Sequence, residues 1–317
     1  SHYIINHVLC IRGNNLIMDK VFVLVQTRNY PEYVIDCIKQ IRFFNQNLIF
    51  LLSDSYFYYD YIKDIKNVEI ININKLVKGK NHISFINNQL FDDSFRNGFW
   101  VCATERFFII EDFMKLYNIR NIIQIETDNL IYNNYDKIFD ILEKTSDFSI
   151  ILDNKYRCIP SIVFIKERST LETFNNFYIN YCLTKKLNDM ESLALFYNIY
   201  NKKYPISNLP ITLPNHKFYL LKHIHGINYY NNINLFNGIF DAAAFGQYLG
   251  GVDPRNINGN TVGFINETSV VKPNKFNITW EEDNFKRKRP FIQYRNRNIP
   301  IFNLHIHSKN LKMFMSI

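Results

Sequence analysis

The stretch Val21-Phe22-Val23-Leu24-Val25 decides the fold, together with the two elements directly after it. Such a continuous β-branched and aromatic run is typical of a strand that is buried on both faces of a parallel sheet. Pro31 suits a first helical turn, and apolar residues three and four apart predict an amphipathic helix over 31–44. A second buried strand is predicted over 48–52. Strand, helix and strand in this order form a βαβ unit.

The alternation continues along the first two thirds of the chain. Strands are predicted over 68–73, 121–125, 148–152 and 161–165, and helices over 105–117, 135–143, 168–183 and 189–200, with a polar loop at 78–88. This pattern predicts an α/β fold with a Rossmann-type open, mostly parallel sheet and helices on both faces. Ligands of such sheets bind beyond the carboxyl ends of the strands.

From Lys203 onward the sequence becomes rich in Pro, Asn and Gly, which predicts an irregular C-terminal half. One helix-like stretch at 240–249 and a final strand at 301–306 interrupt it. No Pro/Ser linker, charge block or internal repeat separates the two halves. A single domain over 1–317 is therefore predicted.

Composition excludes several classes of protein. A chain of 317 residues with 47% hydrophobic and 16% aromatic residues is neither disordered nor fibrous. The 37 basic and 29 acidic residues leave a net charge of +8, which fits an anionic partner such as a nucleotide, a phosphate or a polyanion. No apolar run approaches the roughly 18 residues of a membrane helix.

The five cysteines are odd in number and include no CxxC pair, so neither a disulfide framework nor a zinc ribbon is predicted. This pattern favours a reducing compartment such as the cytoplasm. Because the chain begins at Ser1 and not at Met, it is also interpreted as an excised domain of a longer protein.

Glu126-Thr127-Asp128 follows directly on the predicted strand 121–125. Side chains two residues apart leave a strand end on the same side, so the two carboxylates can share a hard divalent cation. Mg²⁺ and Mn²⁺ prefer such oxygens and keep open positions for substrate phosphates. The alternative interpretation is a solvated turn at the end of the strand.

A second candidate motif, His305-Ile306-His307-Ser308-Lys309, ends the predicted last strand. Strand alternation places His305 and His307 on one face, where a neutral imidazole can bind a metal. Lys309 can meet a phosphate as a point charge. The alternative interpretation is a pair of surface histidines near the end of the chain.

Taken together, three segments resemble the GT-A glycosyltransferases, above all the retaining group that includes glycogenin and bacterial lipopolysaccharide galactosyltransferases. They are Thr104-Glu105-Arg106-Phe107-Phe108, the strand 121–125 with Glu126-Thr127-Asp128, and His305-Ile306-His307-Ser308-Lys309. The resemblance implies a GT-A-like fold in which 20–165 bind a nucleoside diphosphate sugar and 166–317 bind the acceptor. It further implies transfer from a UDP-linked donor to a glycan, lipid or protein hydroxyl, with retention, and Mn²⁺ or Mg²⁺ as cofactor.

The resemblance also assigns roles to residues. Asp128 corresponds to the metal ligand of the family motif, with His305 or His307 as the distal ligand. Glu126 stands where the family's first acid contacts ribose or metal. The remaining donor-site residues are Thr27 and Arg28 for nucleobase and ribose, Asp54 and Arg106 on the donor side, and Lys309 for the pyrophosphate.

Two segments are candidates for the acceptor side. Asp189 and Glu191 open a predicted helix; either is a candidate general base if the enzyme inverts, or an acceptor-binding carboxylate if it retains. Their alternative role is to stabilise the helix N-terminus. In 240–251, Asp241 is available to sugar hydroxyls, and the small residues allow close approach of backbone or sugar. The alternative there is a tightly packed helix with a Gly C-cap.

Two competing functions remain open: a sugar- or nucleotide-binding module without turnover, and a nucleotidyltransferase. The second usually needs a Gly-rich phosphate loop after the first strand, where this chain has Gln26-Thr27-Arg28-Asn29. The basic run Lys286-Arg287-Lys288-Arg289 is interpreted as a solvated loop, because charge runs usually are. Nucleic acid is therefore not predicted as a partner.

Overall fold

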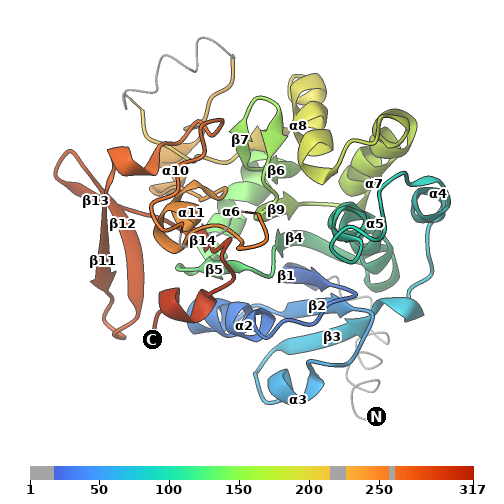
Figure 1. Ribbon diagram of the computed structural model, residues 1–317, viewed down its shortest axis with the longest axis horizontal. Helices are drawn as coiled ribbons and strands as arrows, with labels where there is room; N and C mark the ends of the chain where they lie inside the picture. Colours follow the sequence, from blue (N-terminus) through green and yellow to red (C-terminus); the bar gives the residue numbers. More distant parts are fainter. Residues whose placement is uncertain (1–17, 215–225, 257–260) are drawn as a thin grey trace.

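The computed structural model describes residues 18–214, 226–256 and 261–317 (Figure 1). Its centre is a seven-stranded sheet in the order β10-β6-β9-β4-β1-β2-β3. The strands are β1 (Met18–Gln26), β2 (Ile49–Ser53), β3 (Val68–Asn72), β4 (Ile119–Ile125), β6 (Phe148–Ile150), β9 (Ile162–Ile165) and β10 (Ile206–Asn208).

The order of the strands creates a switch point beside β1. Strand β1 pairs in parallel with both β2 and β4, and β2 pairs in parallel with β3, whereas β9 runs antiparallel to β4 and β6. The chain therefore adds β2 and β3 on one side of β1 and then places β4 on the other side. A crevice for ligands is expected beyond the carboxyl ends of β1 and β4.

Helices cover both faces of this sheet. The Phe139 ring of α6 (Asp136–Thr145) lies 5.4 Å from that of Phe22 in β1, and the Phe113 ring of α5 (Phe99–Tyr117) lies 5.1 Å from that of Phe50 in β2. Phe50 pairs with Val23, the neighbour of Phe22, so the two contacts are on opposite faces. The predicted α/β fold with an open, mostly parallel sheet is confirmed.

The other helices are α2 (Tyr33–Phe44), α3 (Tyr59–Ile62), α4 (Lys80–Asn88), α7 (Arg168–Phe177), α8 (Asp189–Tyr200), α10 (Ile233–Phe236) and α11 (Ala244–Gly250). Short 3-10 or π segments are η1 (Ile73–Lys75), η2 (Tyr178–Cys182), η3 (Leu183–Lys185), η4 (Pro273–Lys275) and η5 (Leu311–Phe314). No helix within the described ranges is long and apolar enough to cross a membrane. Cys37, Cys102, Cys158 and Cys182 are free thiols, and Cys10 lies outside the described residues.

Three smaller sheets complete the fold. They are β5 (Asn129–Ile131) with β14 (Asn303–His305), β7 (Leu152–Asn154) with β8 (Arg157–Cys158), and β11 (Asn277–Glu282) with β12 (Lys288–Tyr294) and β13 (Arg297–Pro300). In the first of these sheets, His305 is paired with Asn129, one residue beyond Asp128. Strand β14 thus carries the C-terminal segment to the carboxyl end of β4.

Several predicted boundaries were wrong. The predicted loop at 78–88 contains α4, in which six of the nine residues are polar, so its composition favoured a loop. The predicted helix over 168–183 leaves α geometry at Tyr178, and the helix predicted from 105 begins at Phe99.

The basic run in the C-terminal half is not a purely solvated loop, because it leads into β12. Arg287 pairs with Asp283 at 2.7 Å, and the Arg289 Nε donates to the Tyr132 carbonyl at 2.8 Å. Two of its four charges are therefore committed to contacts within the fold. Short strands of mixed polarity such as β11 and β13 carry no strong alternation, so the sequence did not indicate this sheet.

Helix α11 packs directly on the backbone of β14. A Cβ placed on Gly246 would lie 2.0 Å from the His305 carbonyl oxygen, a distance no real contact allows. The Asp241 carboxylate fixes the same junction, because it accepts the backbone N–H groups of Phe245 and Gly246 at 2.9 Å each. The small residues of 240–251 thus admit a backbone, one of the two partners predicted for them.

We expect Gly246→Ala to lower the free energy of unfolding by about 2 kcal/mol, because the methyl group forces α11 away from β14. Urea unfolding measures the change. Gly250→Ala in the same helix is the control: its Cβ would lie 3.1 Å from a ring carbon of Phe314, a side chain that can shift. Equal losses in the two variants would contradict the tight junction at Gly246.

Candidate metal and donor site

Glu126, Asp128 and His305 form the one group of candidate metal ligands found in the described part of the chain. Their ligand atoms all lie within 4.8 Å of one another. The His305 Nε2 is 3.0 Å from the Asp128 Oδ2 and 3.6 Å from the Glu126 Oε2. Two of these residues follow β4 and the third ends β14, so pairing of β14 with β5 brings the two predicted motifs together.

The backbone around His305 sets its protonation pattern. Its Nδ1 lies 2.9 Å from the Ala242 carbonyl oxygen, which can only accept a hydrogen bond. The Nδ1 therefore carries a proton, and in the neutral ring the Nε2 offers its lone pair toward Asp128. Two carboxylates and one imidazole suit Mn²⁺ or Mg²⁺.

Positive charges gather on Asp128. Burial alone would raise the pKa of Asp128, but His305 and Lys309 outweigh it and hold this pKa well below its usual value. Burial likewise opposes protonation of His305, yet Asp128 raises the His305 pKa to about 9. The Lys309 ammonium also forms an ion pair with Asp128. A proton and an ammonium group thus stand where a divalent ion would fit.

His307 lies outside this group of three. Its Nδ1 accepts the backbone N–H of Asp253 at 3.0 Å. Burial, and then the nearby Lys309 charge, lower the pKa of His307 to about 4, so the ring is neutral. Of the two predicted histidines, only His305 faces the carboxylates of Glu126 and Asp128 within the described structure.

Arg106 holds the Glu126 carboxylate in position. Its guanidinium is buried and lies 2.7 Å from the Glu126 Oε1 and 2.6 Å from the Asp189 Oδ2. The predicted donor-side arginine thus contacts an acid of the metal group. Asp189 was predicted to face the acceptor; instead it is 2% exposed and bound to Arg106, so it positions the arginine.

The other two predicted acceptor-side acids also have local structural contacts. Glu191 and Asn188 form a capping box at the start of α8, in which the Glu191 carboxylate accepts the Asn188 N–H at 3.1 Å. Asp241 is buried, and it accepts the His305 N–H at 3.1 Å in addition to the two N–H groups of α11. Burial raises the Asp241 pKa to about 6. These contacts fit the alternative roles given to the two segments, at a helix start and in a tightly packed helix, and the contacts of Glu191 and Asp241 with an acceptor stay predictions.

The loop after β1 lies where the donor contacts were predicted. The Arg28 N–H donates to the Asp54 Oδ2 at 3.1 Å, and the Tyr30 hydroxyl donates to the Asp54 Oδ1 at 2.8 Å. Asp54 therefore anchors this loop to the end of β2. Thr27 lies at the same strand end, directly after β1. The Arg28 guanidinium pairs with Asp93.

A loop over residues 89–98, ahead of α5, was missed in the sequence. Besides the Asp93–Arg28 pair, its Arg96 Nη2 contacts the Asp253 Oδ2 at 2.6 Å. The loop thus connects the β1 side of the crevice with the segment that contacts His307. One usable signal was Asn97-Gly98, a dipeptide typical of turns, in which both residues have positive φ angles (57° and 74°).

Comparison with known proteins gives likenesses of fold. No protein-family model matches the chain, and no curated protein matches its sequence. The apo form of mouse xyloside xylosyltransferase 1 is 10% identical with a TM-score of 0.44, over 61% of this chain and 85% of that one. The galactosyltransferase LgtC, in complex with donor and acceptor sugar analogs, is 8% identical with a TM-score of 0.43, over 68% and 81%.

A cytidylyltransferase from Leptospira borgpetersenii is also similar, at 10% identity and a TM-score of 0.38, over 64% of this chain and 79% of that one. Glycosyltransferases of the GT-A type are thus among the solved structures with a similar fold, as is a nucleotidyltransferase. At these identities the likeness concerns the fold, and the functional argument rests on the site.

If Asp189 positions Arg106, Asp189→Ala should lower the free energy of unfolding by about 3 kcal/mol, because it leaves a buried guanidinium without one partner. Chemical denaturation measures this loss. Glu191→Ala, which removes only the exposed half of the capping box, should cost about 1 kcal/mol or less. An unfolding free energy unchanged in Asp189→Ala would contradict the positioning role.

Without metal, stability should depend on pH through His305. Its pKa is about 9 in the folded state, against an ordinary value of 6.5 for an unfolded chain, so its contribution is complete below pH 6.5 and is lost as the pH rises through 9. The loss is on the order of 3 kcal/mol. Denaturant unfolding in EDTA should show this slope in the wild type and a flatter one in His305→Gln. Identical slopes would show that His305 is not charged in the folded protein.

Proposed function

We propose that this chain is a metal-dependent glycosyltransferase that moves a sugar from a nucleoside diphosphate sugar, UDP-linked, to a hydroxyl acceptor. The observation that carries the proposal is the Glu126–Asp128–His305 group at the carboxyl end of β4. It lies beside the switch point between β1 and β4, where open α/β sheets bind nucleotides.

The charges of the site suit a diphosphate. Glu126, Asp128 and His305 would hold Mn²⁺ or Mg²⁺, which would neutralise the charge that develops on the departing diphosphate. With Asp128 holding the ion, the Lys309 ammonium, which now pairs with Asp128, would be available to a phosphate oxygen. Arg106 keeps the Glu126 carboxylate directed at the site from its buried position.

The nucleoside is assigned to the ends of β1 and β2. Thr27 and Arg28 follow β1, and Asp54 follows β2 and holds the Arg28 backbone. This loop contains no glycine, and its Arg28 has a φ of 62°. A nucleotidyltransferase usually cradles phosphates there with glycines, so the loop supports sugar transfer over nucleotidyl transfer.

Retention of configuration is part of the proposal. An inverting enzyme needs a free carboxylate as general base, and the two predicted bases, Asp189 and Glu191, are both engaged, as is the predicted acceptor contact Asp241. Asp189 binds Arg106, Glu191 closes a capping box, and Asp241 accepts three backbone N–H groups. In the transfer, the acceptor oxygen bonds to the anomeric carbon, the bond from that carbon to the diphosphate breaks, and the hydroxyl proton passes to the diphosphate.

A panel of UDP-, GDP- and TDP-sugars with Mn²⁺ tests the proposal through release of nucleoside diphosphate. We expect release from one donor, its loss in EDTA, and a fall of at least about 100-fold in Asp128→Asn, because the metal site then lacks a carboxylate. Asp64→Asn alters an exposed acid of the same type and should keep full turnover.

Two results would contradict this assignment. Release that survives EDTA in the wild type would remove the metal from the reaction. Wild-type turnover in a folded Asp128→Asn variant would remove the carboxylate from the site. Heat protection by one donor without any turnover would instead support the binding-module alternative.

A further inference from the structure

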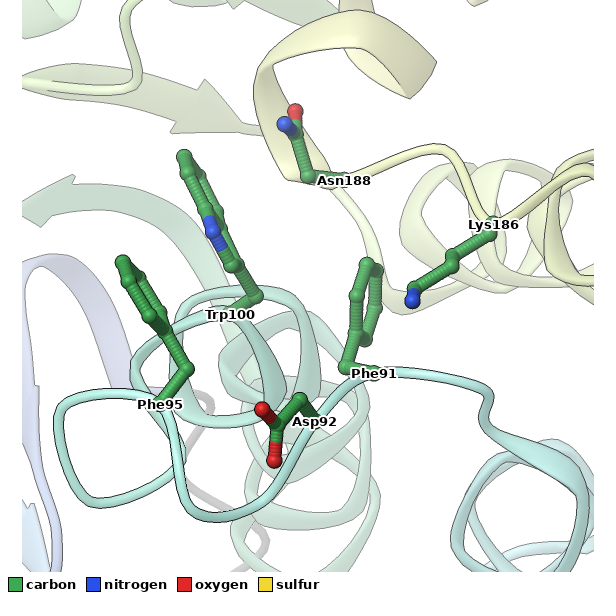
Figure 2. A pocket seen from close by; sticks show the side chains of 6 residues that line it. All are labelled: Phe91, Asp92, Phe95, Trp100, Lys186 and Asn188. Atoms are coloured by element: carbon green, nitrogen blue, oxygen red, sulfur yellow. The ribbon is translucent and has the colours of Figure 1, made fainter.

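An aromatic cavity opens in front of α5. It has a volume of about 350 Å³ and is lined by Phe91, Asp92, Phe95, Trp100, Lys186 and Asn188 (Figure 2). Figure 2 shows Phe95 and Trp100 on one side, from the loop 89–98 and the first turn of α5, with Asn188 and Lys186 opposite, ahead of α8. This volume falls at the lower end of the range for small-molecule sites.

The lining of the cavity suits the ring of a sugar. Phe95 is 44% exposed, and Trp100 and Phe91 are partly exposed, so aromatic faces stand open to solvent. The electron-rich face of an aromatic ring attracts the C–H groups on the apolar face of a pyranose. Asn188, whose side-chain oxygen accepts the Glu191 N–H at 3.0 Å, keeps its NH₂ group as a donor suited to a hydroxyl.

The charge of the cavity also favours a neutral ligand. It contains one carboxylate, Asp92, and one ammonium group, Lys186, which leave no net charge. The Asp92 side chain is exposed, and its Oδ1 is held by Ser94. A phosphate or a diphosphate would instead require an excess of positive charge.

Both walls of the cavity are linked to the donor site through neighbouring residues in the chain. The loop that carries Phe91 and Phe95 also carries Asp93, which pairs with Arg28. On the opposite wall, Asn188 immediately precedes Asp189, whose carboxylate binds Arg106 and, through it, Glu126. Both walls are thus built on segments that contact donor-site residues.

We propose that this aromatic cavity binds a pyranose ring of the acceptor, so that the acceptor is a carbohydrate and not a lipid chain or a protein segment. The inference rests on the proposed function, since it names the acceptor class of the same reaction. Phe95 and Trp100 stack on the ring, and Asn188 and Asp92 contact its hydroxyls.

Binding can be followed through the fluorescence of Trp100, which lines the cavity. The chain has two tryptophans, so Trp280→Phe leaves Trp100 as the only one. We would titrate this variant with methyl glycosides of glucose, galactose, mannose, xylose and N-acetylglucosamine and follow its emission. One glycoside should give a saturable change, and an added Phe95→Ala should weaken its binding at least about tenfold. No change with any glycoside, or a change with uridine instead, would overturn the proposal.

Transfer to the glycoside that binds is measured next, beside donor hydrolysis without acceptor. Phe95→Ala should reduce transfer at least about tenfold, mainly through KM, because ring binding is lost. Tyr156→Ala, which removes an aromatic ring that is 72% exposed outside the cavity, should leave transfer unchanged. Wild-type transfer in a folded Phe95→Ala variant would overturn the cavity assignment alone. Absent donor hydrolysis in the wild type would instead contradict the proposed function.

Discussion

The pairing of β5 with β14 is the constraint on which the site depends, because it places His305 beside the end of β4. A buried network of amides holds the pair: the Asn303 Nδ2 donates to the Asn129 Oδ1 at 3.0 Å and to the Asp241 carbonyl at 2.9 Å, and the Asn303 Oδ1 accepts the Asp241 N–H at 3.0 Å. Buried amides that lose a partner cost about 1–3 kcal/mol each, so these strands have one favourable register.

The charges gathered at the site balance among the side chains themselves. Three carboxylates meet three cationic groups, since His305 is protonated in the absence of metal: Glu126, Asp128 and Asp189 against Arg106, His305 and Lys309. In the proposed reaction, a divalent ion in place of the His305 proton would add two positive charges and remove one. The resulting positive excess would attract an anionic diphosphate, so metal and donor should favour one another's binding.

The sequence predicted those parts of the site that depend on local patterns. Strand periodicity located β1, β2 and β4, and the spacing of Glu126 and Asp128 follows from the end of β4. The position of Asp189 could not be predicted in this way, because an acid at a helix start looks the same whether it faces a cleft or a buried arginine. What decides between these roles is the packing of α8 against α5, which no local pattern encodes.

The cavity depends on a contact of the same non-local kind. His82 of α4 is buried between the Asp112 Oδ2 at 2.6 Å and the Glu105 Oε1 at 3.1 Å, both on α5. This contact fixes α4 on α5, and therefore both ends of the loop 89–98 between them. A loop held at both ends and tied to Arg28 and Asp253 in its middle keeps its aromatic rings in place before a ligand arrives. Such preorganisation reduces the entropic cost of ordering the loop, so weak contacts with a neutral sugar ring can still give useful affinity.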